Sequence, residues 1–272
     1  MLVPQLTEEQ HVGSMGDASQ QCQDMTLLAP RDHKNYFEPQ QYLNEYYGSS
    51  NMIGGLKLPI AFLPSVAARL PHCSTLLDVG SGPTVYVAMG FRHKVDNIYL
   101  SDFADQNRRE LQNWCRGKAN FDWRPTAEAI AKLEGNSDEW HSVEEVARKR
   151  VSAILYCNVH NKPVLPPPYA HMTFDVVTSV FCLEYASSTS AEYQLAVKNL
   201  CSLIKPGGWL FLGGALEEKF YTLGSKRFTC YYLTEEELLQ ALHDNGIDVH
   251  SQDFSYYNSD DVFVVFGKKV SN

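Results

Sequence analysis

Five short apolar runs alternate along this chain with segments of helical period, and this alternation limits the possible folds more than any other feature. The runs cover residues 75–79, 97–101, 153–157, 174–181 and 209–212. A strand with one face in water alternates apolar and polar residues, whereas a strand buried on both faces is a nearly continuous apolar run. Because helices must cover both faces of such a sheet, the pattern predicts an α/β fold with a doubly wound, mostly parallel sheet.

The C-terminal part of the chain departs from this alternation. Thr234 and Glu237 have the spacing of a capping box at the start of a helix, and two more strands are expected at residues 247–257 and 262–268. The polar residues 258–261 between these strands are typical of a hairpin turn. The sequence therefore predicts a seven-stranded sheet that ends in an antiparallel hairpin.

The domain organisation follows from changes in composition. Residues 1–30 are rich in Gln, Ser, Gly and Asp, have no sustained period, and are expected to form a flexible tail. Residues 31–272 are expected to form a single domain. Within it, residues 31–70 form an N-terminal lid with helices, and residues 71–272 form the core.

Several helix boundaries can be predicted from single residues. Pro39 should start a short helix that ends at Gly48. A second helix over residues 55–70 contains Pro59 and Pro64, which should interrupt it because proline lacks the backbone N–H.

The composition argues against several classes of function. Lys and Arg total 23 against 32 for Asp and Glu, a net charge of −9, whereas nucleic-acid binding needs a basic face. The longest apolar stretch, residues 174–183, is broken by Thr178 and Ser179 and is far shorter than the ~18 to 20 residues that span a bilayer. The seven cysteines and nine histidines lack metal-ligand spacing. We therefore expect a monomeric, cytoplasmic protein with reduced thiols, no metal, and neither a membrane nor a nucleic-acid partner.

A glycine-containing turn and an acidic strand end supply the first chemical signature. Gly80 and Gly82 follow the first strand, where glycines let a ligand approach backbone N–H groups. Asp102 ends the second strand, twenty residues after Gly82, where a carboxylate can accept hydrogen bonds from a ribose. A tight turn would also explain the glycines, and a helix cap would explain an Asp, but Asp105 is better placed for capping.

The turn favours one class of nucleoside. A dinucleotide fingerprint needs a third glycine at position 85, which is Val85 here, and no G-K-[ST] sequence for triphosphates is present. This disfavours a nicotinamide-nucleotide oxidoreductase. A glycine loop without phosphate-binding residues, followed by an acid for the ribose, points to S-adenosylmethionine as the cofactor.

Seven segments together resemble one family. They are FEPQQYLNEYY, LLDVGSGPTVY, SDFADQN, CNVH, FCLE, KPGG and GGALEE, in this order along the chain. They are similar to the small-molecule amine N-methyltransferases of the nicotinamide, phenylethanolamine and indolethylamine type, over residues 33–270. The resemblance implies a class I methyltransferase core, which is Rossmann-like, and an N-terminal lid.

The resemblance also implies which residues hold S-adenosylmethionine. Asn158 departs from the family, which usually has Asp there at the adenine amino group; asparagine still offers one carbonyl acceptor, so weaker binding is expected. Tyr36 also departs, because the family's tyrosine lies further before Phe37. The residues expected to contact the cofactor are Tyr42, Tyr47, Gly80, Ser81, Gly82, Thr84, Tyr86, Asp102, Asn107, Asn158, Val159 and Val180.

Carboxylates after the fourth and fifth strands are the candidates for the reaction itself. An amine must lose a proton before methylation, and a carboxylate can bind the cation and accept that proton. Glu184 and the pair Glu217 and Glu218 lie at the correct strand ends. The resemblance to the phenylethanolamine enzymes favours Glu184 and Glu218 as catalytic, substrate-binding residues. It adds two further substrate-binding candidates, Asp260 and Lys57.

The acceptor is expected to be a small aryl-alkyl amine. The nicotinamide-type members carry an Asp where this chain has Gly214 and a Ser where it has Cys230. These differences disfavour nicotinamide, but nicotinamide and indolethylamine remain alternatives. A third alternative is a member that binds the cofactor without catalysis, which the presence of both Glu184 and Glu218 disfavours.

Overall fold

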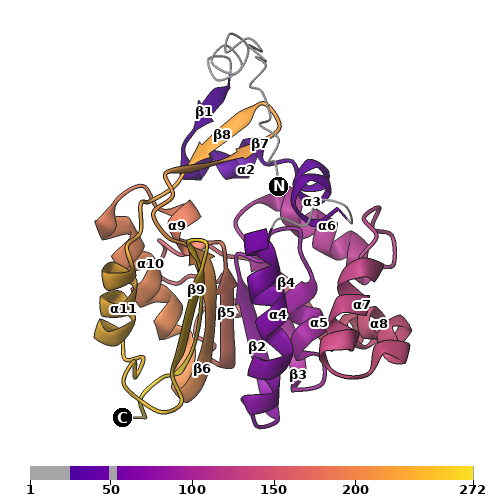
Figure 1. The fold of residues 1–272 in the computed structure, drawn as a ribbon. Helices are drawn as coiled ribbons and strands as arrows, with labels where there is room; N and C mark the ends of the chain where they lie inside the picture. The colour runs from indigo at the N-terminus through magenta and orange to yellow at the C-terminus, as the bar shows by residue number, and fades with distance from the viewer. Residues whose placement is uncertain (1–24, 49–53, 272) are drawn as a thin grey trace, which may run out of the picture.

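The computed structural model describes residues 25–48 and 54–271, with no side chains described for residues 54–56, and is built around one seven-stranded sheet (Figure 1). Five strands are parallel, and β10 pairs antiparallel with both β6 and β9. This confirms the predicted α/β class and the C-terminal hairpin. In spatial order the strands are β4 (Val151–Tyr156), β3 (Val95–Asp102), β2 (Cys73–Val79), β5 (Phe174–Val180), β6 (Ile204–Ala215), β10 (Val262–Lys268) and β9 (Ser255–Ser259).

Helices cover both faces of the sheet, as the apolar strands require. Successive residues of β2 show the two faces, because Leu76 packs into one core cluster and Leu77 into the other. The helices on the Leu76 side are α4 (Gly54–Arg69), α5 (Tyr86–Phe91), α6 (Asp105–Cys115), α7 (Arg124–Leu133) and α8 (Trp140–Arg150), with η2 (Ser137–Glu139) before α8. Those on the Leu77 side are α10 (Ser190–Ser202) and α11 (Glu235–Asp244).

A small three-stranded sheet forms a cap over the carboxyl edge of the large sheet, at the top of Figure 1. Its strands, in spatial order, are β1 (Thr26–Leu28), β8 (Lys226–Thr229) and β7 (Phe220–Leu223). The short elements η1 (Pro30–Asp32), α2 (His33–Tyr36) and α3 (Pro39–Tyr47) link β1 to the core, and α9 (Leu183–Ala186) lies below them. None of the three cap strands was predicted, and the expectation of a flexible tail is wrong for residues 26–28.

Two predicted elements have different boundaries. Helix α4 continues through Pro59 and Pro64, so the predicted interruption is wrong. Ile60, Leu63 and other residues of α4 are buried in the core, and this burial outweighs the backbone hydrogen bonds that the prolines cannot make. The strand predicted to begin at Ile247 begins at Ser255, because the polar residues between them form turns.

The predicted capping box of α11 is confirmed, with Thr234 and Glu237 as its members. Thr189 caps α10 by accepting a hydrogen bond from the Glu192 N–H. Asp105 is not a cap. It lies in the first turn of α6, and the cap position is Ala104.

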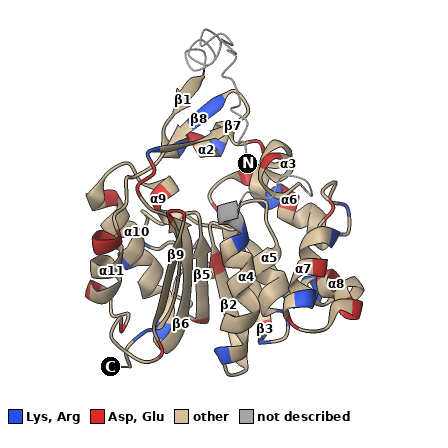
Figure 2. Ribbon diagram, viewed as in Figure 1, with Lys and Arg blue, Asp and Glu red and all other residues tan. Residues whose placement is uncertain are grey.

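No helix within residues 25–48 and 54–271 is long and apolar enough to cross a membrane. Acidic and basic residues are interspersed along α7 and α8 (Figure 2). Several of them form ion pairs, such as Lys149 with Glu145 and Arg148 with Glu144. The basic residues of α8 therefore belong to a surface of mixed charge.

Candidate active site

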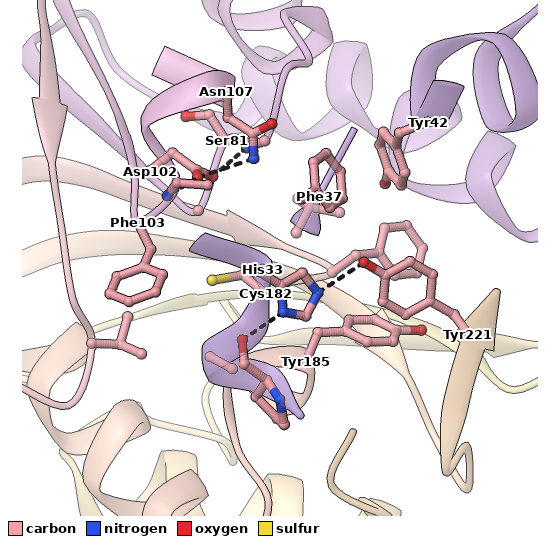
Figure 3. Close-up of a pocket in the computed structure, with 18 of the residues that line it drawn as sticks. His33, Phe37, Tyr42, Ser81, Asp102, Phe103, Asn107, Cys182, Tyr185 and Tyr221 are labelled. Atoms are coloured by element: carbon pink, nitrogen blue, oxygen red, sulfur yellow. Dashed lines mark hydrogen bonds between the residues drawn. The ribbon is translucent and has the colours of Figure 1, made fainter. Parts of the chain in front are cut away.

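A cavity of about 590 Å³ lies at the carboxyl edge of the large sheet, beneath the cap (Figure 3). The ends of the parallel strands form its floor, and residues from η1, α2, α3 and β7 form its roof. Ligand crevices of open α/β sheets lie at this edge. All of the residues predicted to contact the cofactor line this cavity. Of the four predicted substrate-binding residues, only Glu218 lines it.

The glycine turn between β2 and α5 shapes one side of the cavity. Gly80 and Gly82 have φ angles of 71° and 60°, which residues other than glycine rarely adopt. A Cβ on Gly80 would collide with the Cys182 thiol, whereas Gly82 faces open space. Ser81 fixes the turn, because its N–H donates to the Ser101 carbonyl at 2.9 Å. The turn therefore leaves space for a ligand beside Gly82, where another residue would place its side chain.

Asp102 lies at the centre of a buried hydrogen-bond network beside this turn (Figure 3). Its Oδ2 accepts from the Gly82 N–H at 2.8 Å, and its Oδ1 accepts from the Ala104 N–H at 2.8 Å and from Asn107 Nδ2 at 3.1 Å. Burial raises the pKa of Asp102, and these hydrogen bonds oppose the rise. The carboxylate retains a lone pair on Oδ2 for one further donor.

Asn107 offers a second acceptor next to Asp102. Its Oδ1 is buried and has no hydrogen-bond partner within the described part of the chain. A buried polar atom without a partner costs free energy, so a ligand donor is expected there. Asp102 and Asn107 together therefore fit a diol, with one hydroxyl on each residue.

Tyrosines from α3 close the cavity beside the glycine turn. The Tyr47 ring stacks on the Tyr86 ring with centroids 5.8 Å apart, and the Tyr42 ring lies 5.0 Å from both Phe37 and Tyr46. Tyr42 and Tyr47 are the two residues that were predicted to come from the lid. Burial raises the pKa of both, so their hydroxyls stay protonated and act as neutral hydrogen-bonding groups.

The opposite end of the cavity is aromatic and contains a carboxylate. Glu218 Oε2 accepts a hydrogen bond from the Tyr185 hydroxyl at 2.8 Å. The Tyr185 ring contacts the Tyr221 ring edge-on with centroids 5.1 Å apart, and both rings line the cavity. Glu217 has a φ of 56°, and its side chain bonds the Tyr232 hydroxyl, outside the cavity lining. The two successive glutamates therefore lie in different environments, and Glu218 is the one at the cavity.

Glu184 lies behind the cavity wall and is almost completely buried. Its Oε1 accepts from the Ala215 N–H at 2.9 Å, and Ala215 itself lines the cavity. Burial raises the pKa of Glu184 to about 8, and the charge of Glu218 adds to the rise. A Cβ at Gly214 would collide with Glu184 Oε1 and with the Phe263 ring, so glycine leaves the space that Glu184 fills.

Two predicted substrate-binding residues are placed elsewhere. Lys57 is exposed on α4, and Asp260 is exposed in the β9–β10 turn, where its φ is 51°. Neither lines the cavity, although Val262 at the start of β10 does. The structure therefore does not bring these two residues together with Glu218.

Asn158 and Val159 follow β4 and line the cavity on the side of the predicted adenine site. Asn158 Oδ1 accepts from the His160 N–H at 3.0 Å. The side-chain carbonyl that was expected to meet an adenine amino group is therefore directed at its own loop, with one of its two lone pairs in use.

Several cavity residues were missed because they come from unpredicted elements. His33 in α2 donates from Nδ1 to the Pro30 carbonyl at 2.6 Å, so its Nε2 accepts from the Tyr221 hydroxyl at 2.8 Å (Figure 3). His33 also stacks on Phe228 with centroids 4.4 Å apart, and burial lowers its pKa. Near the aromatic end of the cavity, only the FCLE segment and the tyrosine-rich segment before the core had a sequence motif that pointed to a site. The β7–β8 hairpin had none.

The chain is similar to known methyltransferases in both sequence and structure. Residues 25–270 match the model of the NNMT/PNMT/TEMT family. The chain is 35% identical to the nicotinamide N-methyltransferase of Caenorhabditis elegans, covering 88% of this chain and 91% of that protein. It is 35% identical to the indolethylamine N-methyltransferase of Oryctolagus cuniculus, with 80% and 85% covered. It is 34% identical to the phenylethanolamine N-methyltransferase of Macaca mulatta, with 78% of each covered.

Solved structures support the fold at lower sequence identity. The magnesium protoporphyrin IX methyltransferase of Synechocystis PCC 6803 with bound SAM has a TM-score of 0.52 and 15% identity, covering 89% of this chain and 95% of that one. The N-methyltransferase NodS of Bradyrhizobium japonicum with S-adenosylhomocysteine has a TM-score of 0.51 and 11% identity, with 85% and 97% covered. The family match and the class I fold together show that the chain belongs to the NNMT/PNMT/TEMT family of S-adenosylmethionine-dependent N-methyltransferases.

Proposed function

We propose that this enzyme methylates the nitrogen of a small aryl-alkyl amine. The observation that carries the proposal is Glu218, a carboxylate at the aromatic end of the cavity beside Tyr185 and Tyr221. An ammonium group gains a charge-assisted hydrogen bond from such a carboxylate, and cation–π attraction from the tyrosine rings adds to it. The rings also provide an apolar surface for the aryl group.

We propose that the other end of the cavity holds S-adenosylmethionine, which supplies a methyl group already activated by its sulfonium. Asp102 Oδ2 and Asn107 Oδ1 are the free acceptors for the ribose hydroxyls. The space beside Gly82 would receive the methionine end. Tyr42, Tyr47, Ser81, Thr84 and Tyr86 would enclose that end, while Asn158 and Val159 border the adenine and Val180 lies below.

In the proposed mechanism the protein contributes positioning and proton transfer. Glu218 binds the protonated amine and accepts one proton from its nitrogen, which then passes to solvent. The nitrogen lone pair forms the new N–C bond as the C–S bond breaks, and S-adenosylhomocysteine is the other product. The cap excludes water and holds the nitrogen in line with the transferred methyl group. Glu184 would support the wall at Ala215 rather than touch the amine.

Nicotinamide is the second candidate acceptor. A nicotinamide N-methyltransferase is among the relatives at 35% identity, and an aromatic cavity end also accommodates a pyridine ring. The collision of any Cβ at Gly214 with Glu184 argues against it, because the nicotinamide-type pattern needs an Asp side chain there.

A panel of acceptors tests the proposal. The purified chain would be supplied with labelled S-adenosylmethionine and with phenylethylamine, tryptamine or nicotinamide at equal concentration. We expect phenylethylamine to give the highest kcat/KM. A higher value for nicotinamide than for either amine would overturn the proposed acceptor while leaving the methyltransferase assignment intact.

We also propose that the enzyme is a cytoplasmic monomer. The six cysteines within the described residues are free thiols, which fits a reducing compartment. Sedimentation of the purified chain at the mass of one subunit, and fractionation with cytosolic markers, would support this proposal. A stable dimer or a secreted form would contradict it.

A further inference from the structure

Asn158 lines the cavity, and three of its four polar groups form hydrogen bonds within its own loop. Its backbone N–H donates to the Val164 carbonyl at 3.1 Å, and its backbone carbonyl accepts from the Asn161 N–H at 3.0 Å. Its Oδ1 accepts from the His160 N–H at 3.0 Å. Within the described chain, Nδ2 is the polar group of Asn158 for which no hydrogen bond is found.

The identity of the two amide atoms follows from chemistry. A backbone N–H can only donate, so the atom of Asn158 that faces the His160 N–H must be the carbonyl oxygen. The planar amide then directs Nδ2 away from that contact, since the two atoms lie on opposite sides of the same carbon. Asn158 lines the cavity, and Nδ2 is its one polar group with no partner in the described chain, so this donor is the group that most needs an acceptor from a ligand.

A hydrogen-bond donor at this position limits which atoms of adenine can bind Asn158. The exocyclic amino group of adenine donates, whereas its ring nitrogens N1 and N7 accept. Two donors that face each other would leave both groups without a partner, which costs free energy. We infer that Asn158 recognises the cofactor base through a ring nitrogen, by donating from Nδ2, and does not bind the amino group. This inference rests on the proposed position of the adenine beside Asn158 and Val159.

The inference has a consequence for specificity. A base that keeps its ring nitrogens but lacks the amino group loses no contact with Asn158. A base in which the contacted ring nitrogen is replaced by carbon loses the acceptor and leaves Nδ2 without a partner. Asn158 should therefore make the enzyme tolerant of the first change and intolerant of the second.

The test compares four forms of S-adenosylhomocysteine by calorimetry on the full chain. They are the natural compound, its analogue without the amino group, and the analogues with N1 or N7 replaced by C–H. We expect the affinity to fall by about tenfold or more for one ring-carbon analogue, and to change by less than about twofold for the analogue without the amino group. The readout is a ratio of affinities, so it does not depend on which amine is methylated.

Asn158→Asp provides the converse variant. A carboxylate keeps one oxygen for the His160 N–H and turns the other, an acceptor, toward the base. We expect this variant to lose affinity when the amino group is missing and to tolerate the ring-carbon change better. Asn161→Asp is the matched control, because it adds the same charge on an exposed residue of the same loop that does not line the cavity. It should keep the wild-type pattern.

Two results would overturn the inference. One is a wild-type protein that loses affinity without the amino group and keeps it with both ring-carbon analogues. The other is equal affinity for all four compounds, since Asn158 would then not read the base at all. If the affinity ratios of the four compounds are as expected but no amine is methylated, only the proposed acceptor would be overturned. Complete failure to bind S-adenosylhomocysteine would overturn both.

Discussion

Gly214 and Glu184 depend on each other, and together they shape the wall of the proposed acceptor site. Any side chain at 214 would occupy the space of the Glu184 carboxyl, which is held there by the Ala215 N–H. The buried carboxyl in turn carries a raised pKa and lies near Glu218. Glu218, which lines the cavity, therefore has a second, buried acid near it that does not line the cavity.

Asp102 gives the first prediction at this scale. Asp102→Ala removes the free acceptor on Oδ2 and the hydrogen bonds that order the Gly82 and Ala104 backbone. We expect the affinity for S-adenosylhomocysteine to fall by roughly tenfold to a hundredfold, about 1.4 to 3 kcal/mol. Calorimetry on the folded variant measures this. Asp105→Ala, an exposed change three residues away, should bind normally, and normal binding by Asp102→Ala would count against the ribose assignment.

Glu184 gives a prediction about pH. Burial raises the pKa of its carboxyl to about 8 in the folded protein, whereas an unfolded glutamate has a pKa of about 4.3. The unfolded chain therefore loses this proton first as the pH rises, and the folded state loses stability until the pH passes the folded pKa. Glu184→Gln has no such proton. We expect the free energy of unfolding of the variant, minus that of the wild type, to rise between about pH 5 and 8 by up to about 4 kcal/mol.

Urea unfolding at several pH values measures this difference. Glu236→Gln, an exposed substitution on α11, should give a curve parallel to the wild type over the same range. A parallel curve for Glu184→Gln would show that Glu184 ionises normally, and the assignment of a buried neutral acid would be wrong.

At the scale of elements, the N-terminal segment and the β7–β8 hairpin hold each other over the cavity. β1 pairs with β8, His33 bonds Tyr221, and the Tyr46 hydroxyl donates to the Thr222 carbonyl at 2.5 Å. Gln106 on α6 ties the same segment to the core by donating to the His33 carbonyl. The cap is thus fastened by a few hydrogen bonds and aromatic contacts, in contrast to the large apolar core.

This contrast predicts ligand-dependent protection of the cap. Helix α3 contributes Tyr42 and Tyr47 to the cavity wall, so a bound cofactor should reduce its local opening. We expect amide hydrogen exchange in α3 to slow by about tenfold or more with saturating S-adenosylhomocysteine. Helix α11, which does not line the cavity, is the internal control. Equal exchange in α3 with and without ligand would contradict a closing role for this helix.

At the scale of the whole molecule, the cavity has one end made by the βα core and the other made by the cap and the ends of β5 and β6. The core end was predictable, because apolar runs locate the strands and ligand-binding residues follow their carboxyl ends, as Gly80 and Asp102 do. Methyltransferases at 11% to 15% identity share this fold. In our proposal the carboxyl edge of the sheet holds the cofactor, and the cap adds the acceptor end.

The cap could not be predicted from the sequence for physical reasons. Its strands have three or four residues and no clear period, and β1 pairs with β8 across almost the whole chain. Long-range pairing of such short strands leaves no local pattern. Tyr221 in β7 was therefore missed, and so were His33 in α2 and Tyr185 in α9, which are helices of only four residues. Lys57 and Asp260 were assigned to the acceptor site, but they do not line the cavity.

The central claim is that Glu218 holds the ammonium group of an aryl-alkyl amine, and the kinetics of Glu218→Gln test it most directly. The substitution keeps the shape and removes the charge. Glu217→Gln is the matched control, because it makes the same change one residue earlier, on a side chain outside the cavity lining.

We predict that Glu218→Gln lowers kcat/KM for phenylethylamine by roughly tenfold to a thousandfold, about 1.4 to 4 kcal/mol of transition-state stabilisation. Glu217→Gln should stay within about threefold of the wild type, and both variants should bind S-adenosylhomocysteine normally. The contradicting result is a Glu218→Gln enzyme with an unchanged kcat/KM for phenylethylamine.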